Sequence, residues 1–459
     1  MTQPKLLRQL GVFSATAIVV SNMVGTGIFT TTGFLAGDLG SAWLVVAIWF
    51  VGAALALAGA LCFSEMGINL PRSGGEYVFL TEAWGPIWGF LTGWVSFFAG
   101  FSAPTAAAAL ATSEYLGYFY PALSARNAGP GLSLGFFALH FGPGQLVACG
   151  IVAAFTLVNV VGLLRAAQIQ NFLTTTKVLV IVAFLGLAVL VGKGDWAHFS
   201  MPAARTSTNS VPVQFILSLV WVYFGYSGWN AAAYVAEELR DPERTLPRSL
   251  LAGTLLVALL YAGLNVVFIY ASPLESMKGV IGVGAHAAGT LFGPAVAGTF
   301  SGLMAFSLLS TVSAMTIIGP RVYYAMASNR AFFRIAERVH PRWKTPWIAV
   351  LAQGACCCLL IVTGTFSSLV QYIGFSLWFF TALTVLGMFR LRRRPGWKPL
   401  AAANLAFPLI PGVYVASAVW VLSYMVWRQP KESGYGLLTM AVGALLWMGA
   451  RRWGLGVGD

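Results

Sequence analysis

Two short segments with glycine and polar residues interrupt apolar stretches that are otherwise long enough to cross a lipid bilayer. They are residues 21–29, SNMVGTGIF, and residues 223–230, YFGYSGWN. A helix exposed to lipid cannot leave backbone groups unpaired, so an interruption persists only where it lines a cavity walled by protein. Paired interruptions in corresponding positions of two halves of a chain are typical of a transporter's substrate site.

Each interruption creates two new helix ends inside the membrane. The half-helix that begins there exposes N–H groups and a positive dipole end, and the half-helix that ends there exposes carbonyl groups and a negative end. Together they suit the carboxylate and the ammonium group of an α-amino acid, and Thr26 and Ser227 add hydroxyl groups. Close helix packing is the alternative explanation for Gly25, Gly27 and Gly228. Two interruptions with polar side chains favour the ligand site.

A lysine also lies within a predicted membrane span. Lys177 follows the segment 171–176, NFLTTT, and precedes a nearly apolar run. Ionisable groups inside a membrane are costly and usually functional, although a lysine near the cytoplasmic end can also reach water by snorkelling. Since no acidic residue lies deep in the spans, we expect the ammonium to hold the place of a bound cation. Its expected partners are carbonyl groups at the first interruption and the hydroxyl groups of Ser310, Thr311 and Ser313.

The composition predicts an all-α polytopic membrane protein. The chain has 459 residues, of which 58% are hydrophobic and 9% are charged, whereas soluble domains are about 25% charged. We expect one transmembrane domain over 1–459, with spans 1–5 at 11–192, spans 6–10 as an inverted repeat at 213–389, and spans 11–12 at 402–451. The twelve apolar runs lie at 11–36, 42–67, 84–111, 145–164, 170–192, 213–236, 248–271, 291–319, 347–364, 368–389, 402–427 and 434–451.

The basic residues predict the orientation of these spans. An even number of spans puts both termini on one side, and most of the 27 Lys and Arg residues fall in loops on that side. The positive-inside rule then predicts cytoplasmic termini in a multi-pass protein of the cell's inner, cytoplasmic membrane. The first apolar run is too long for a secretory signal peptide. Thus the formal charge of +13 reflects topology, and we expect no nucleic-acid partner.

No enzymatic or metal-binding pattern is present in the sequence. The four histidines are scattered in predicted loops without an HExxH motif. The five cysteines lie in predicted spans, where cysteine usually packs as a small apolar residue. We therefore expect no catalytic residues, cofactor or metal. A membrane-embedded sensor or enzyme is the alternative from another class, and it would need an output domain or clustered catalytic groups.

Several motifs resemble those of amino acid–polyamine–organocation transporters. Residues 23–29 match the small-Gly-Thr/Ser-Gly-Ile-Phe signature of the first span, and residues 60–67 and 71–77 are similar to the segment after span 2. Residues 224–247 are similar to span 6 of the L-type amino acid transporter branch. The resemblance implies the leucine-transporter fold, alternating access and sodium-independent movement of amino acids, commonly by exchange. We predict an exchanger of neutral amino acids, with a proton-coupled symporter that uses Lys177 as the alternative.

The resemblance also implies roles for single residues. Amides at Thr26 and Gly27 would bind the substrate carboxylate, and carbonyl groups near Met23, Phe224 and Gly225 would bind its ammonium group. Phe224 matches an aromatic residue that closes over the substrate, and Lys177 matches a span 5 lysine that stands where sodium binds in sodium-coupled relatives. The whole predicted substrate site comprises Met23, Gly25, Thr26, Gly27, Ile28, Phe224, Gly225, Ser227 and Gly228.

The chain departs from the L-type pattern in two places. Ser227 falls where many L-type members have glycine, so the preferred substrate side chain stays open. The loop between spans 3 and 4 lacks the cysteine that joins animal members to a glycoprotein, so no disulfide-linked heavy subunit is expected, as in bacterial members.

A cytoplasmic gate is the last element expected from the sequence. Besides Phe224, we assign Glu238 to the gate. Glu65, Glu237 and Glu238 would pair with Arg72 or Arg240, or would simply be solvated loop charges.

Overall fold

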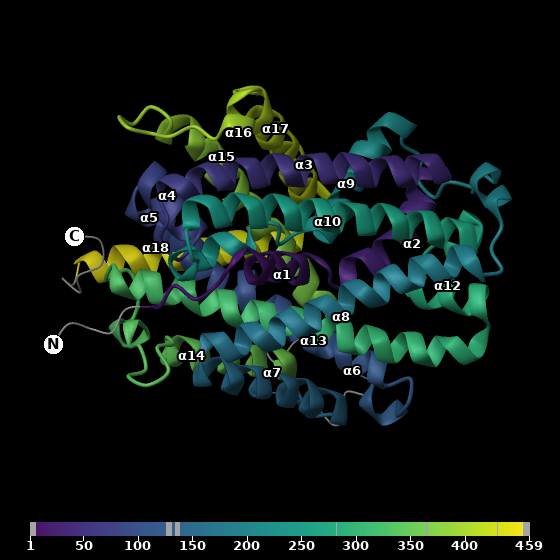
Figure 1. The fold of residues 1–459 in the computed structure, drawn as a ribbon, viewed down its shortest axis with the longest axis horizontal. Coiled ribbons are helices and arrows are strands. Elements are labelled where there is room, and N and C mark those ends of the chain that lie inside the picture. The colour runs from purple at the N-terminus through teal and green to yellow at the C-terminus, as the bar shows by residue number, and fades with distance from the viewer. Residues whose placement is uncertain are drawn as a thin grey trace.

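The computed structural model consists almost entirely of helices that run along the long axis of the molecule (Figure 1). It describes residues 6–124, 131–133, 138–280, 282–363, 366–428 and 430–452. The first and last described segments lie at the same end of the helical bundle (Figure 1). An even number of crossings gives this arrangement, which the sequence predicts.

Within the described ranges, ten helices are long and apolar enough to cross a membrane, and two shorter apolar helices lie at Trp347–Thr363 and Ser433–Gly449. Each overlaps one of the twelve predicted spans. Side chains on the outer helices expose large apolar groups, such as Leu190 and Trp427. Such groups suit a lipid environment rather than water.

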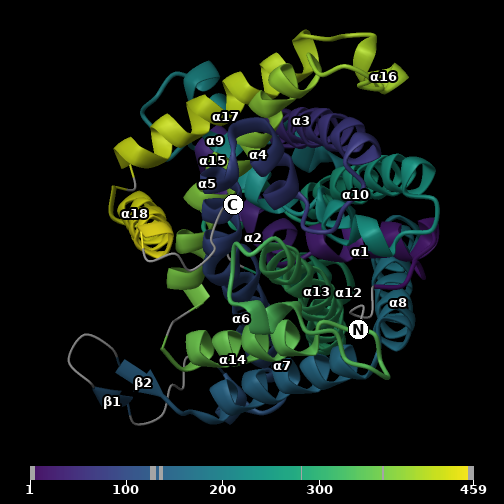
Figure 2. The ribbon, with the colours of Figure 1, turned by 90° about the vertical axis from the view of Figure 1, so that its left-hand side faces the viewer.

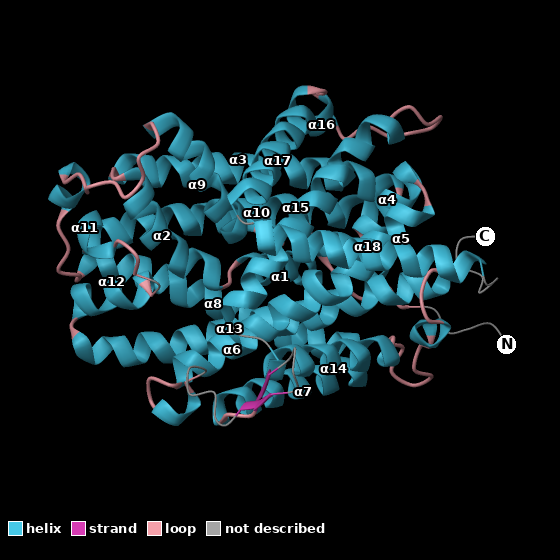
Figure 3. Cartoon of the chain, turned by 180° about the vertical axis from the view of Figure 1, so that it is seen from behind, coloured by secondary structure: helices cyan, strands magenta, loops and turns pink. Residues whose placement is uncertain are grey.

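The first half of the chain contains five spans, of which the first is broken. It comprises α1 (Val12–Met23) with α2 (Thr26–Leu39), then α3 (Ala42–Asn69), α4 (Glu76–Trp84), α5 (Pro86–Val95), the π-helical turn η1 (Ser96–Ser102), α6 (Ala103–Leu116), η2 (Pro121–Leu123), β1 (Gly131–Ser133), β2 (Ala138–His140), α7 (Pro143–Val161), α8 (Leu163–Leu190) and η3 (Trp196–Ser200). Strands β1 and β2 pair antiparallel, and Figure 3 shows them as a small hairpin beside α7.

The second half again begins with a broken span. It comprises α9 (Val211–Tyr226) with the 3₁₀ helix η4 (Ala231–Glu238), then α10 (Pro242–Ala271), α11 (Leu274–Met277), α12 (Val283–Phe292), α13 (Pro294–Ser328), η5 (Arg334–Glu337), α14 (Trp347–Thr363), α15 (Phe366–Leu391), α16 (Ala401–Asn404), α17 (Leu409–Arg428) and α18 (Pro430–Arg452). In the end view of Figure 2, α17 and α18 lie at the periphery, while α1 and α2 are surrounded by other helices.

Several predicted boundaries differ from the structure, among them the start of the seventh span, at Pro242 rather than 248, and of the eleventh, at Leu409 rather than 402. Two other differences bear on the site. The fourth and fifth spans meet at Gly162, whose φ of 148° lets the chain turn sharply, so α8 begins at Leu163 rather than near 170. Polar residues such as Arg165 and Gln170 are therefore helical. The eighth span continues through Pro320 to Ser328, well past the predicted end at 319. Its added turns carry Arg321 into the protein interior.

Candidate functional site

The first predicted interruption lies between α1 and α2. Val24 (φ −76°, ψ 88°) and Gly25 (φ −127°, ψ −151°) have non-helical backbone conformations, and helix resumes at Thr26. Because the residues on both sides are helical, the N–H groups of Thr26 and Gly27 and the carbonyl groups of Met23 and Val24 fall at facing helix ends.

The second predicted interruption follows α9. Ser227 is extended, with ψ 142°, and Gly228 has a φ of +99°, a left-handed conformation that favours glycine. A Cβ on Gly228 would also lie 2.5 Å from Nδ2 of Asn22. That amide nitrogen donates to the Gly228 carbonyl at 3.4 Å. The two interruptions are therefore in direct contact, across more than 200 residues of sequence.

The glycines of the site differ in the room around them: some lie in close helix contacts and one faces open space. A Cβ on Gly27 would lie 2.9 Å from the Cα of Gly225, so these two positions allow α2 and α9 to approach closely. A Cβ on Gly25, in contrast, would meet no atom within 4 Å. Thr26 and Phe224 are half-buried. Open space thus lies beside Gly25, whereas Gly27 matches the packing alternative.

A buried tyrosine on the seventh span joins the carbonyl groups of both interruptions. The hydroxyl oxygen of Tyr261 lies 2.7 Å from the Met23 carbonyl oxygen and 3.0 Å from that of Gly225. Because a hydroxyl group has one hydrogen, it cannot satisfy both carbonyl groups fully at once. Tyr261 is not among the site residues predicted from the sequence, although a tyrosine within an apolar span generally needs a polar partner.

The other predicted substrate-site residues differ in exposure. Ser227 is half-buried, and its hydroxyl donates to the Phe224 carbonyl at 2.9 Å. Met23 and Ile28 have fully or almost fully buried side chains. The structure therefore brings all nine predicted residues to the two interruptions, but it turns the Ile28 side chain into the apolar core.

Lys177 lies against the first interruption. Its Nζ donates to the Val24 carbonyl and, at 3.2 Å, to the hydroxyl oxygen of Thr311 on α13. The side chain is 1% exposed, so it does not snorkel to the surface. Of the other two predicted partners, Ser310 donates within its own helix to the Ser307 carbonyl, and Ser313 is buried on the same helix.

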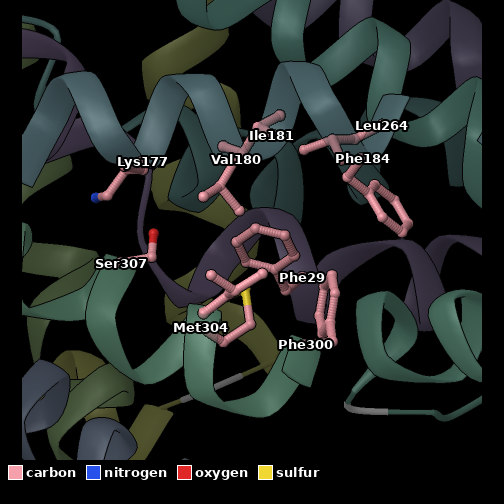
Figure 4. A pocket seen from close by; sticks show the side chains of 10 residues that line it. Phe29, Lys177, Val180, Ile181, Phe184, Leu264, Phe300, Met304 and Ser307 are labelled. Atoms are coloured by element: carbon pink, nitrogen blue, oxygen red, sulfur yellow. The ribbon is translucent and has the colours of Figure 1, made fainter. Parts of the chain in front are cut away.

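A small apolar cavity borders Lys177. It has a volume of about 20 Å³ and is lined largely by aromatic and aliphatic side chains. Figure 4 shows Lys177 at one end and the rings of Phe184 and Phe300 at the other. A cavity of this size holds about one water molecule, so it cannot hold an amino acid.

Glu238 forms a buried ion pair at the end of the molecule that holds the termini. Its Oε2 and Oε1 accept hydrogen bonds from Arg321 Nε at 2.7 Å and Nη2 at 3.2 Å, with side-chain exposures of 1% and 0%. Glu65 pairs instead with Arg392, at 2.6 Å. The predicted pairing of these glutamates with Arg72 or Arg240 is therefore wrong, as is the alternative that they are solvated.

The prediction is wrong because it pairs each glutamate with an arginine that is close to it in the sequence. Arg72 pairs with Glu82, ten residues away, while Arg321 comes from a helix 83 residues after Glu238. The N-terminal segment adds backbone contacts here, since Leu10 bridges Leu239 and the N–H of Leu10 donates to the Glu238 carbonyl at 3.0 Å. This end of the broken spans is closed.

We expect opposite results from enlarging the two glycines of the first interruption. Gly27→Val should lower thermal stability, by about 1–3 kcal/mol as in overpacked cores, and weaken amino acid binding. Gly25→Leu should keep wild-type stability but abolish binding, because the leucine side chain would fill the open space beside residue 25, where we expect the ligand. Melting temperature and binding of labelled amino acids distinguish the two. Normal binding by the stable Gly25→Leu variant would place the ligand elsewhere.

Removing the Glu238 carboxylate should be strongly destabilising. Glu238→Gln leaves Arg321 buried without its counter-charge, a change that typically costs about 3–5 kcal/mol. The matched control is Glu82→Gln, because exposed pairs such as Glu82 with Arg72 contribute only about 0–1 kcal/mol. Thermal unfolding in detergent measures both. Equally small losses of stability in the two variants would show that the ion pair of Glu238 with Arg321 does not stabilise this end of the molecule.

Known proteins similar to this chain are amino acid transporters. A family model described as amino acid permease matches residues 10–443. The large neutral amino acids transporter small subunit 2 of Oryctolagus cuniculus is 29% identical over 447 residues, covering 95% of this chain and 79% of that protein. The serine/threonine exchanger SteT of Bacillus subtilis is 26% identical, covering 97% and 98%. The b(0,+)-type amino acid transporter 1 of Rattus norvegicus is 29% identical, covering 93% and 87%.

These similarities extend over nearly the whole chain rather than over single motifs. They confirm the resemblance drawn from residues 23–29 and 224–247, and with it a leucine-transporter-like helical membrane fold and a transporter rather than an enzyme. The chain belongs to the amino acid permease family of the amino acid–polyamine–organocation transporters.

Proposed function

We propose that this protein exchanges neutral amino acids across the cytoplasmic membrane, without sodium, by alternating access. The observation that carries the proposal is the open space beside Gly25, at the contact between two interrupted spans. The family match supports amino acid transport, and the name of the relative SteT, a serine/threonine exchanger, supports exchange of neutral substrates.

The facing helix ends provide groups for both charged ends of the substrate. In this proposal the N–H groups of Thr26 and Gly27 bind the carboxylate, which the positive end of the α2 dipole favours. The carbonyl groups of Met23 and Gly225 bind the ammonium group, because each has a second lone pair beside its hydrogen bond from Tyr261. The Phe224 carbonyl, which accepts from the N–H and the hydroxyl of Ser227, joins them when the Ser227 hydroxyl turns away. None of the predicted site residues is charged, which favours a neutral substrate side chain.

Lys177 accounts for independence from sodium. Its ammonium group contacts the Val24 carbonyl and Thr311, and a fixed positive charge there leaves no place for a metal cation. The second candidate function is a proton-coupled symporter in which Lys177 loses its proton. The observation that favours this candidate is that Lys177 is buried and, in the described part of the chain, contacts a carbonyl and a hydroxyl group rather than a carboxylate.

The topology completes the proposal. We infer that 11–192 and 213–389 form the two inverted repeats of one domain, and that both termini are cytoplasmic, as the distribution of Lys and Arg predicts. The protein then works without a disulfide-linked heavy subunit. The experiment that tests the function is counterflow of labelled amino acids in liposomes against a panel of unlabelled ones. Absence of stimulation by any internal amino acid would contradict exchange.

Replacement of the span 5 lysine should uncouple binding from transport. We expect Lys177→Ala to reduce exchange at least tenfold in proteoliposomes, while binding of labelled amino acid survives in part, because Lys177 contacts the first interruption from behind the ligand space. The control is Ser310→Ala, whose hydroxyl bonds only within its own helix. Wild-type exchange by Lys177→Ala would remove the lysine from the mechanism.

The same site makes a prediction about ions. Exchange by the wild-type protein should proceed at equal rates in sodium and in choline buffers, since the lysine ammonium occupies the cation position. The measurement is initial exchange rate in matched liposomes. A clear acceleration by sodium would be incompatible with the role given to Lys177.

A further inference from the structure

Glu76 is a buried carboxylic residue that the proposed transport mechanism does not use. It begins α4, outside the membrane-spanning helices, and it is 2% exposed. Across the described ranges, no lysine, arginine or histidine forms an ion pair with it, whereas Glu65 and Glu238 each pair with an arginine. A buried carboxylate without a counter-charge is costly, so this position needs an explanation.

The contacts of Glu76 join three separate elements. Its Oε1 lies 3.1 Å from Nδ2 of Asn230, which donates to it, and 3.0 Å from the hydroxyl oxygen of Thr381 on α15. Asn230 belongs to the second interruption, two residues after Gly228. The carboxyl group therefore lies where the cytoplasmic half of the broken sixth span meets α4 and α15.

The surroundings of Glu76 suit a protonated carboxyl group. Thr381 has one hydroxyl hydrogen, and its helix-internal contact to the Leu377 carbonyl, at 2.6 Å, is shorter than its contact to Glu76. Its oxygen is then free to accept a hydrogen bond from the acid. The hydroxyl of Thr92 also borders the carboxyl group, and it can accept a hydrogen bond from a protonated acid as well as donate one to a carboxylate.

The other titratable groups facing Glu76 are tyrosines. Tyr234 on η4 and Tyr414 on α17 both lie close enough to interact with its charge, and Tyr323 on α13 lies behind Tyr234. Tyrosine hydroxyls are neutral near pH 7 and give no counter-charge. Burial accordingly raises the pKa of Glu76 from its usual value of 4.5 to about 7, against the smaller opposing effect of its hydrogen bonds.

We propose that Glu76 is a proton-binding site that controls the cytoplasmic gate. Glu76 holds a proton while η4 is docked on α4, and it releases that proton to cytoplasmic water when η4 moves away and wets the carboxyl group. On closure the carboxylate takes a proton from the same water. The docked arrangement is held by backbone contacts beside Glu76, including Gly74 N–H to the Tyr234 carbonyl at 3.1 Å.

The direction of the pH effect on closure follows from the surroundings of Glu76 in the closed and the open state. A closed state with a raised pKa binds the proton more tightly than a hydrated open state, so acid stabilises closure. With pKa values of about 7 and 4.5, the closed-to-open ratio rises about tenfold between pH 8 and pH 6. The proposal rests on the proposed alternating access, because it needs the cytoplasmic gate to open.

The experiment compares exchange at pH 8 and pH 6, set equally on both sides of the liposomes, for wild type and two variants. We expect wild-type exchange to slow several-fold at pH 6, Glu76→Gln to be nearly insensitive to pH, and Glu82→Gln to follow the wild type. Glu82 lies on the same helix but at the surface, where Arg72 and Arg394 hold its pKa below the usual value. A flat wild-type profile, or an unchanged slope in Glu76→Gln, would overturn the proposal.

Two further measurements separate this proposal from the transport function. Thermal unfolding in detergent needs no substrate, and the stability of wild type relative to Glu76→Gln should be greatest below pH 4.5 and decline as pH rises through about 7. If no amino acid is exchanged, the proposed function fails while this measurement still tests Glu76. If Glu76→Gln does not fold, infrared spectra of the wild type decide: a protonated-carboxyl band at pH 6 that disappears by pH 8 supports the proposal, and its absence at pH 6 overturns it.

Discussion

Hydrogen bonding of the main chain inside the membrane is the constraint on which this structure depends. Lipid offers no partners, so every carbonyl and N–H group freed by a helix interruption must find one in the protein. Here the partners come from other spans: Tyr261 serves the Met23 and Gly225 carbonyl groups, and Lys177 serves that of Val24. The interruptions are therefore held by side chains that bond to backbone carbonyl groups, and Lys177 also bonds to the Thr311 hydroxyl. In the proposed site, the ammonium group of a substrate competes with Tyr261 for the same carbonyl oxygens, which links ligand binding to the position of α10.

Much of this arrangement is predictable from local sequence, because its causes are local. Glycine and polar residues within an apolar run identify both interruptions, and a lone lysine in a span without acids points to carbonyl and hydroxyl partners. The identity of long-range partners is not local. In the sequence, Arg321 looks like an ordinary loop arginine that follows the end of a span. It reaches Glu238 because α13 continues without a break through Pro320. The roles of Tyr261 and Glu76 cannot be predicted for the same reason, since no neighbouring residue in the sequence indicates what they contact.

The buried charged groups fall into two classes that differ in what they can do. Glu238 with Arg321 and Glu65 with Arg392 are bidentate pairs, in which each charge compensates the other. Separating such partners inside the protein is expensive, so they suit a contact that is either fully made or fully broken and hydrated. Lys177 and Glu76 instead contact neutral groups only, within the described chain. Neither depends on a fixed counter-charge, so each can change its protonation or its partner without leaving an opposite charge stranded.

This division gives the broken sixth span two distinct kinds of control. Its far end, at Glu238, is tied by an ion pair with Arg321 and by the backbone of the N-terminal segment. Its near end, at Asn230, is tied through a carboxyl group whose charge the surroundings disfavour. Opening must wet both ends, and in the proposal made here the end at Glu76 releases a proton when it does. A transporter whose substrate is a zwitterion, with no net charge of its own, can in this way respond to pH without carrying the proton in its binding site.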